Sequence, residues 1–291
     1  MLKKLFNKKI EKQISLYLGG KQIAICHQQE GDLVLLAKKA INSENQWLDV
    51  FSALVTEHHL QGALVSVVLG REFYQTLDLE KPKVEESELL ATLPFSIKDL
   101  VSESVFDLVV DYYDMPFQQR KGEQITVIYL PQTRVLTIRD MLLTLGLKLK
   151  GITVEELALT ALLGMHDETN ILLSQQNNEL VLTVVKQGQL YFTHRLRGFN
   201  ELLALPLEEV ENALLDGLSL ELQRALDYIN SQLGINTIGT LYLALVCPDI
   251  KILSEKLGNY LARNVVPYGE DDQYDFLAIL AYGGLIAESK A

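Results

Sequence analysis

Cysteine is scarce in this sequence, and what little there is does not suggest redox or metal chemistry. Only Cys26 and Cys247 occur among 291 residues, and both lie in apolar, strand-like runs. We therefore expect buried, reduced thiols rather than a disulfide or a metal site. The sequence also has no CxxC motif and no nucleophile elbow, which leaves it without the common signatures of thiol or serine catalysis.

Long hydrophobic runs are absent as well. The apolar stretch near the end, Phe276 to Ala287, is interrupted by Tyr282, Gly283 and Gly284 and is far shorter than the ~20 residues that span a bilayer. The basic N-terminal segment 1–12 lacks the uninterrupted apolar run of a signal peptide. We expect a cytoplasmic protein. In segment 1–12, Leu2, Leu5 and Phe6 lie among the four lysines at positions 3, 4, 8 and 9, a pattern compatible with contact to acidic lipid or a partner helix, or with a mobile basic tail.

Basic residues are also few relative to acidic ones. The 26 Lys and Arg residues are outnumbered by 38 Asp and Glu residues, giving a net charge of −12. Such a chain repels the phosphate backbone on average, so we expect no nucleic-acid partner. The five histidines, at positions 27, 58, 59, 166 and 194, have no metal-ligand spacing.

Three short apolar runs separated by turn residues open the chain and predict an antiparallel meander: Ile14–Leu18, Ile23–Cys26 and Leu33–Ala37. Apolar residues at helical spacing between Trp47 and His58 predict a helix, and the run Ala63–Leu69 predicts a further strand.

The middle of the first half contains additional material, which we interpret as an inserted subdomain at about 77–118. It comprises a predicted helix, Val84–Leu93, then Pro94 and Phe95, and a predicted strand, Phe106–Tyr113. A strand at Ile125–Leu130, a helix that Gly146 ends, and a strand at Lys148–Ile152 are then expected to close the first lobe.

The second half repeats this plan. Three strand-like runs are followed by a long helix with an apolar stripe from Val210 to Leu233, then by a strand at Leu241–Val246 and a helix from Ile250 to Leu261. This last strand and helix resemble the Ile125–Leu145 segment element for element, which indicates an internal duplication. The three strand-like runs are Asn170–Leu173, Leu180–Val185 and Gln189–Leu196.

A meander followed by helix and strand pairs, present twice, differs from a Rossmann domain, which opens on a strand and helix crossover. The pattern predicts an α/β protein with the actin-like, ribonuclease-H-like bilobed fold. We expect lobes at 13–165 and 166–291, with a C-terminal helix at 274–288 that could pack back on the first lobe.

Several segments together resemble a known family: Leu93–Asp99, Phe106–Tyr113, Thr126–Pro131, Leu145–Leu147, Glu221–Tyr228 and Tyr282–Leu285. They are similar to the actin-like assembly proteins of type IV pili (PilM) and to the cytoplasmic part of the type II secretion protein GspL, and particularly to MSHA-type pilus proteins.

The resemblance implies a scaffold at the cytoplasmic face of the inner membrane, attached through its partner. That partner is the cytoplasmic N-terminal tail of a PilN-like or MshJ-like single-pass protein. An adjoining assembly ATPase is implied, and a homodimer is compatible with the family. The resemblance also places tail binding beside the insertion, where Pro94, Phe95 and Phe106 are either anchors for the tail or the subdomain's own core.

An actin-type nucleotide site needs a carboxylate and a glycine on the first hairpin of each lobe. The first motif falls on Tyr17-Leu18-Gly19 and the second on Ser174-Gln175-Gln176, so both carboxylates are missing. Leu245 to Pro248 replaces the expected glycine pair after the late strand. We therefore expect no catalysis and neither ATP nor magnesium as a cofactor.

Gly19 and Gly20 remain as a remnant of the nucleotide site, or as a tight hairpin that needs positive φ. Two alternative functions stay open: an actin-like ATPase or kinase with altered motifs, and a cell-division-type actin homologue. Arg195, Arg197 and Arg224 form either an anion site or ordinary ion pairs with acidic neighbours.

Overall fold

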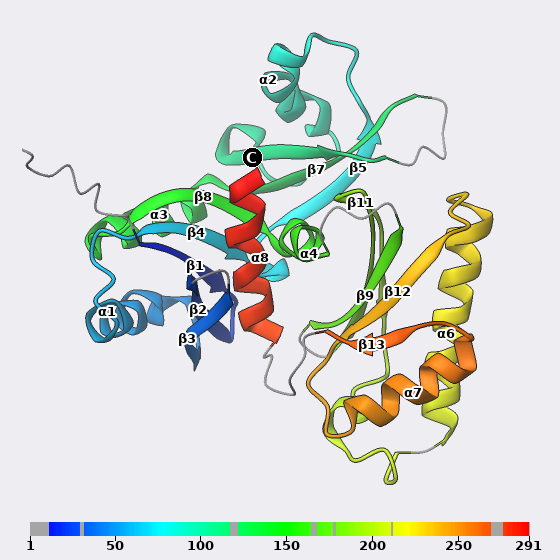
Figure 1. Ribbon diagram of the computed structural model, residues 1–291. Helices are drawn as coiled ribbons and strands as arrows, with labels where there is room; N and C mark the ends of the chain where they lie inside the picture. Colours follow the sequence, from blue (N-terminus) through cyan, green and yellow to red (C-terminus); the bar gives the residue numbers. More distant parts are fainter. Residues whose placement is uncertain are drawn as a thin grey trace, which may run out of the picture.

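The computed structural model describes residues 12–29, 32–116, 122–163, 168–176, 179–210, 212–268 and 276–290. Two five-stranded sheets stand side by side, with a smaller three-stranded sheet above them (Figure 1). No helix in these ranges is long and apolar enough to cross a membrane. Segment 1–12 lies outside the described residues except for Lys12, and so does the predicted boundary at 165/166.

The first sheet has the strand order β3-β2-β1-β4-β8. The three opening strands form the predicted antiparallel meander, and β4 and β8 add in parallel. Helices α1 and α3 cover one face through a core that includes Trp47, Phe51 and Ile138. The elements of this sheet are β1 (Gln13–Leu18), β2 (Gln22–Gln29), β3 (Asp32–Ala40), α1 (Trp47–Glu57), β4 (Leu64–Leu69), α3 (Gln132–Thr144) and β8 (Lys148–Val154).

The second sheet repeats this order as β11-β10-β9-β12-β13. Helices α6 and α7 supply its apolar layer, with Leu218, Leu222 and Leu226 from the α6 stripe and Leu253 and Leu257 from α7. The elements are β9 (Thr169–Gln176), β10 (Glu179–Lys186), β11 (Gln189–Leu196), α5 (Glu201–Ala204), α6 (Asn212–Ser231), β12 (Ile238–Ala244), α7 (Ile250–Leu261) and β13 (Val265–Pro267).

The duplication is present, but one of its predicted equivalences is wrong. β12 pairs in parallel with β9 as β4 pairs with β1, so β12 corresponds to β4. The segment Ile125–Leu130, the predicted equivalent of β12, lies instead in β7 (Gln124–Pro131) at the centre of the small sheet. Both are buried apolar strands preceding a helix, so hydrophobic pattern alone does not reveal which sheet each joins.

The small sheet, here called the insertion sheet, has the order β5-β7-β6 and carries α2 on one face. Its strands run antiparallel and extend from Gln75 to Pro131, which is wider than the predicted 77–118. The predicted end of its helix is also wrong, because Pro94 lies inside α2. Leu89, Leu93 and Ile97 continue a buried stripe at four-residue spacing past the proline. The elements are β5 (Gln75–Glu80), α2 (Glu86–Ile97) and β6 (Leu108–Asp114).

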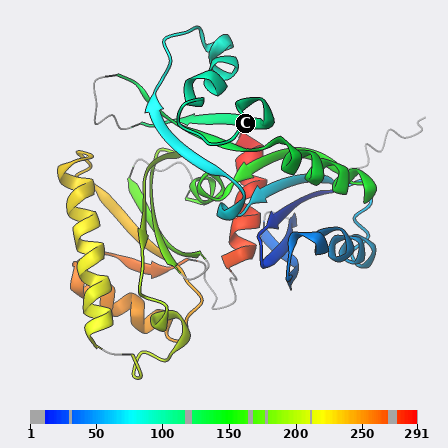
Figure 2. The same cartoon turned by 180° about the vertical axis from the view of Figure 1, so that it is seen from behind.

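Two helices, α4 (Glu155–Leu162) and α8 (Phe276–Lys290), lie between the large sheets (Figures 1 and 2). α8 packs against β1, β2, β4 and α4. The core around these helices joins residues of both lobes, including Tyr17, Val68, Leu172 and Leu280. The lobes are therefore held together by buried apolar surface.

Candidate functional site

The turn between β1 and β2 contains the two glycines left from the nucleotide motif. Neither Gly19 nor Gly20 has positive φ, so our expectation of a positive-φ hairpin is wrong. Close approach explains the glycines instead. A Cβ at Gly19 would lie 2.7 Å from the Gln22 carbonyl oxygen and 2.9 Å from the Tyr17 ring. The Gly19 N–H already donates to that carbonyl at 3.0 Å.

A carboxylate of the chain itself occupies the turn. The backbone N–H of Gly20 donates to Oε1 of Glu72, just beyond the end of β4. A Cβ atom at Gly20 would lie 3.0 Å from one oxygen of this carboxylate, and a Cβ atom at Gly70 would lie 2.7 Å from the other. Backbone N–H groups in such a turn are the donors that bind phosphate in nucleotide sites. Here Glu72 takes that donor and adds a negative charge that would repel phosphate.

Tyr17, which replaces the first expected carboxylate, is bonded to a buried acid. Its hydroxyl donates to Oε1 of Glu155 at 2.8 Å, and the backbone N–H of Arg71 donates to the same oxygen at 3.2 Å. Among the described residues, Oε2 of Glu155 has no hydrogen-bond partner. Burial, with a further contribution from the nearby carboxylates Glu156 and Glu72, raises the pKa of Glu155 to about 8. The Glu155 side chain is therefore mainly protonated at neutral pH.

Burial, followed by the Glu155 charge, raises the pKa of Tyr17 far above its usual value. The pair is therefore largely a neutral, buried hydrogen bond. A neutral phenol and a protonated acid give a magnesium shell no anionic ligand. Within the ranges that the structure describes, no group of three or more His, Cys, Asp or Glu side chains is arranged to hold a metal.

The second-lobe motif has structural contacts of its own. Ser174 is buried and its hydroxyl donates to the Val181 carbonyl at 3.3 Å. Gln175 accepts from the backbone N–H of Val246 at 3.4 Å, tying the end of β9 to the segment after β12. These side chains hold strands together and supply no carboxylate.

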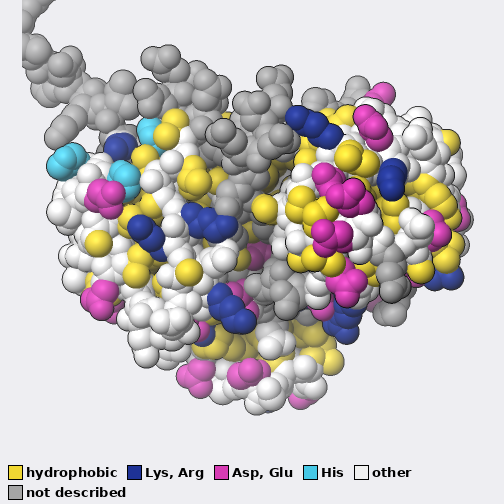
Figure 3. All heavy atoms as spheres, turned by 90° about the horizontal axis from the view of Figure 1, so that it is seen from below, with side chains coloured by type: hydrophobic (Ala, Val, Ile, Leu, Met, Phe, Trp, Pro, Cys, Tyr) yellow, Lys and Arg dark blue, Asp and Glu magenta, His cyan; other side chains and the backbone are white. Residues whose placement is uncertain are grey.

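Two of the three arginines considered as an anion site lie together. Arg195 and Arg197 both bind Glu179, at 3.2 and 2.8 Å. Arg224 instead pairs with Glu221 on α6. More widely, acidic side chains gather on the second lobe in the face seen in Figure 3, whereas basic ones are scattered over it.

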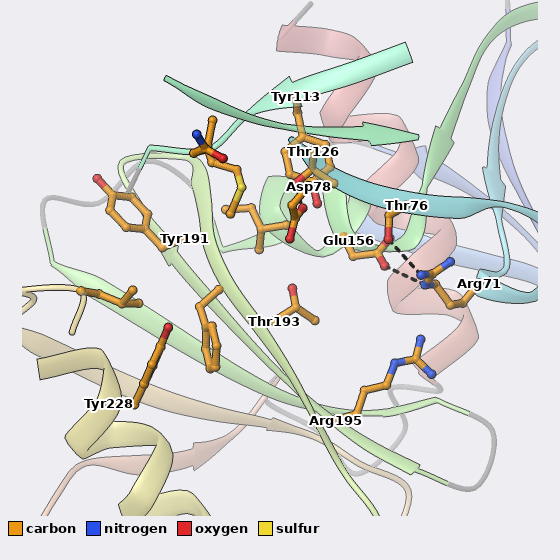
Figure 4. Close-up of a pocket in the computed structure, with 15 residues that line it drawn as sticks. Arg71, Thr76, Asp78, Tyr113, Thr126, Glu156, Tyr191, Thr193, Arg195 and Tyr228 are labelled. Atoms are coloured by element: carbon orange, nitrogen blue, oxygen red, sulfur yellow. Dashed lines mark hydrogen bonds and ion pairs between the residues drawn. The ribbon is translucent and has the colours of Figure 1, made fainter. Parts of the chain in front are cut away.

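A cleft of about 520 Å³ opens between the insertion sheet and the second lobe. Its roof is the polar end of the insertion sheet, with Thr76, Asp78 and Thr126, and its floor is β11 with α6 behind it. Figure 4 shows Tyr191 and Tyr228 toward one end and Arg71 and Arg195 toward the other. Arg71 is held by Glu156 at 3.4 Å and by Thr76 at 3.1 Å. Sequence inspection missed this cleft because its walls come from segments far apart in the chain.

The proposed partner-binding residues lie on the surface of the insertion. Phe95 is 63% exposed and Phe106 is 79% exposed, while Pro94 is half-buried in α2. The alternative that the two phenylalanines fill the subdomain core is therefore wrong. Five of the fourteen exposed large hydrophobic side chains on the described residues fall within this short stretch: Val84, Leu90, Phe95, Leu100 and Phe106. A contiguous patch of exposed apolar side chains often marks a binding surface, and this stretch is the candidate for one.

Comparison with known proteins identifies the fold. No protein-family model matches the sequence, and no curated protein matches it. A solved structure of the PilM-PilN type IV pilus biogenesis complex is similar over 96% of this chain and 98% of that chain, with TM-score 0.64 and 17% identity. The cytoplasmic domain of EpsL, an inner-membrane component of the Vibrio cholerae type II secretion system, is similar over 94% and 95%, with TM-score 0.54 and 13% identity.

A third structure, from Bacteroides thetaiotaomicron, is a protein of actin-like ATPase fold and unknown function. It covers 92% of this chain and 94% of its own, with TM-score 0.51 and 11% identity. In each case the likeness covers more than nine tenths of this chain. The chain therefore has the actin-like fold, as its repeated strand order predicted.

Proposed function

We propose that this chain is a scaffold of a type IV pilus assembly platform, of the MSHA type represented by MshI. It works at the cytoplasmic face of the inner membrane. It binds the cytoplasmic N-terminal tail of a PilN-like or MshJ-like single-pass protein and adjoins the assembly ATPase. The likeness to the PilM-PilN and EpsL structures over nearly their full length supports this proposal.

The observation that carries the proposal is the filling of the hairpin site by the chain's own groups. The Glu72 carboxylate accepts from the Gly20 N–H. The Tyr17 side chain, bonded to Glu155, stands at the position where a metal-binding carboxylate is needed. A fold that retains the actin-like architecture while closing its phosphate cradle is suited to holding partners rather than to hydrolysing ATP. Function follows from the site rather than from the fold.

The tail should bind at the exposed apolar surface of the insertion. We expect the double variant Phe95→Ser and Phe106→Ser to weaken binding of a synthetic tail of the PilN-like or MshJ-like protein at least about tenfold, since exposed aromatic anchors dominate such contacts. Its melting temperature should change little, because neither ring is part of the core. Fluorescence anisotropy measures the binding.

Leu143→Ser provides a matched control, because Leu143 lies on α3 and is 64% exposed, close to the value for Phe95. It should bind the tail as the wild type does. Unchanged affinity in the double phenylalanine variant would place the tail elsewhere and refute the assigned anchors.

ATP with magnesium should leave the melting temperature unchanged. A ligand at a hundred times its dissociation constant adds about 2.7 kcal/mol of stability, which for a chain of this size is a rise of several degrees. Because the Glu72 carboxylate already accepts from the Gly20 N–H, we expect the melting temperature to rise by less than about one degree at millimolar ATP. Differential scanning fluorimetry tests this, with an ATP-binding actin-fold protein as the positive control. A rise of several degrees would favour the ATPase alternative.

A further inference from the structure

The floor of the cleft is an open strand edge. β11 is the outermost strand of the second sheet, and in the part of the chain that the structure describes it pairs only with β10. Four consecutive residues, Leu190 to Thr193, and then Arg195, line the cleft. Tyr191 is an extra residue at a β-bulge and has no partner on β10. Phe192 pairs with Val184 and Thr193 with Thr183, so these two side chains lie on opposite faces of the strand. A lining that includes both faces indicates that the cleft meets the edge of β11 rather than one face.

We propose that this cleft binds an extended peptide segment with an acidic residue at one end as an added strand on β11. An exposed edge presents unpaired N–H and C=O groups, and main-chain pairing to such an edge is a common mode of peptide recognition. The lined stretch covers five residue steps, or about 17 Å at ~3.4 Å per residue, enough for a segment of about six residues. This site is separate from the apolar insertion surface and goes beyond the tail-binding function proposed above.

The roof favours a single strand over a larger occupant. The face of the insertion sheet opposite α2 is apolar where Val109, Ile128 and Leu130 pack on the first lobe. It becomes polar where it extends over the cleft, with Thr126 donating to Asp78 at 2.7 Å. If a second copy of this chain paired through its own β11, the β10 strand and the insertion sheet of that copy would have to enter the cleft as well. A space of about 520 Å³ beneath the roof does not admit that bulk.

Charge favours an acidic residue at one end of the segment, beside Arg195. Arg71 at the cationic end is balanced by Glu156. Arg195 and Arg197 share the single carboxylate of Glu179, and Arg195 reaches the cleft with a side chain 41% exposed. The remaining lining carboxylate, Asp78, lies in the roof and accepts from Thr126. The positive excess is therefore local to the Arg195 end, and the cleft as a whole is balanced. A glutamate or aspartate of the peptide would pair with the Arg195 guanidinium, which has further donors to offer.

The other end of the cleft favours an apolar side chain. Phe192 and Tyr228 lie with their ring centroids 5.0 Å apart, and Tyr191 and Leu233 adjoin them. The peptide should therefore carry an acidic residue at the Arg195 end and an aliphatic or aromatic one at the Phe192 end. Tyrosine and phenylalanine surfaces are frequent anchor sites for such side chains.

A random heptapeptide library displayed on phage, selected against the full-length protein, supplies the probe. Enriched peptides should contain an acidic residue and lose at least about tenfold in affinity for Arg195→Glu. Replacing that acidic residue with lysine should restore binding to the variant. Methylating peptide N–H groups one at a time should weaken binding at every second position, since strand N–H groups alternate in direction. In the wild type, hydrogen exchange should slow in residues 189–196.

Arg139→Glu is the control, because Arg139 is a half-exposed arginine on α3 that pairs with Asp140. Arg195→Gln repeats the test without charge reversal if Arg195→Glu is unstable. Any of three results would overturn the inference. The first is a set of peptides that bind Arg195→Glu as tightly as they bind the wild type, and the second is the absence of any enriched peptide. The third is an N-methyl series in which the loss of binding does not alternate along the peptide. Enriched peptides that depend on Phe95 and Phe106 instead would leave the scaffold function standing and remove only this site.

Discussion

Glu155→Gln should raise the stability of the protein above neutral pH and flatten its pH dependence. Glu155 is buried at the start of α4, and its pKa in the folded state is about 8, above the ordinary glutamate value of 4.5. Folding therefore favours the protonated acid. The stability that this proton contributes is fully present below pH 4.5 and is lost as pH rises through about 8. The loss amounts to roughly 5 kcal/mol.

Glutamine keeps the contacts while removing the charge. Its side-chain oxygen can still accept from the Tyr17 hydroxyl and the Arg71 N–H, as Oε1 of Glu155 does. Its NH₂ group takes the place of the protonated Oε2, which has no partner within the described residues. The difference in melting temperature between Glu155→Gln and wild type should grow from near zero at pH 4.5 to on the order of 10 °C at pH 8.5.

Thermal unfolding followed by circular dichroism across this pH range measures the effect. Glu255→Gln, at an exposed position on α7, should follow the wild type throughout. A constant difference between Glu155→Gln and wild type at all pH values would mean that Glu155 is already ionised in the folded protein.

The sequence was sufficient for the local elements and the duplicated plan. Short alternating or continuous apolar runs separated by turn residues predicted β1, β2 and β3, and the stripe from Val210 to Leu233 predicted α6. These signals are local, because one face of each element must be buried. Assigning β7 to a sheet required knowing its neighbours. The hydrophobic pattern of β7 does not encode its neighbours, because the buried residues of β7 belong to both the insertion core and the first-lobe core.

The filled hairpin site was only half predictable. Loss of the carboxylate at Tyr17 was visible in the motif, but the groups that replace its function were not. Glu72 is separated from Gly20 by 52 residues and Glu155 from Tyr17 by 138 residues. Two adjacent glutamates directly after a strand, at Glu155 and Glu156, are the one signal that could have drawn notice. The helix dipole explains acidic residues in a first turn equally well, so that signal is weak.

Gly283→Ala should destabilise the protein by about 1–3 kcal/mol or more, because α8 and α4 cross too closely for a methyl group. A Cβ at Gly283 would lie 2.3 Å from the Ala158 carbonyl oxygen and 2.7 Å from its carbonyl carbon. These are backbone atoms of α4, so no side-chain rotation relieves the clash and the helices must separate. Overpacking of a tight core costs about 1–3 kcal/mol, and occasionally more. The shift also disturbs the apolar core that joins the two lobes.

Gly217→Ala is the matched control for this prediction. Gly217 lies within α6, where the nearest atom to an added Cβ is Phe199 Cε1 at 3.7 Å, an ordinary contact. Alanine there should stabilise the helix by up to about 1 kcal/mol. Urea unfolding should be followed by circular dichroism for the whole chain and by the fluorescence of Trp47, the single tryptophan, for the first lobe. If α4 and α8 cross as described, the two glycine variants shift the midpoint in opposite directions. A Gly283→Ala midpoint at or above that of the wild type would contradict this packing.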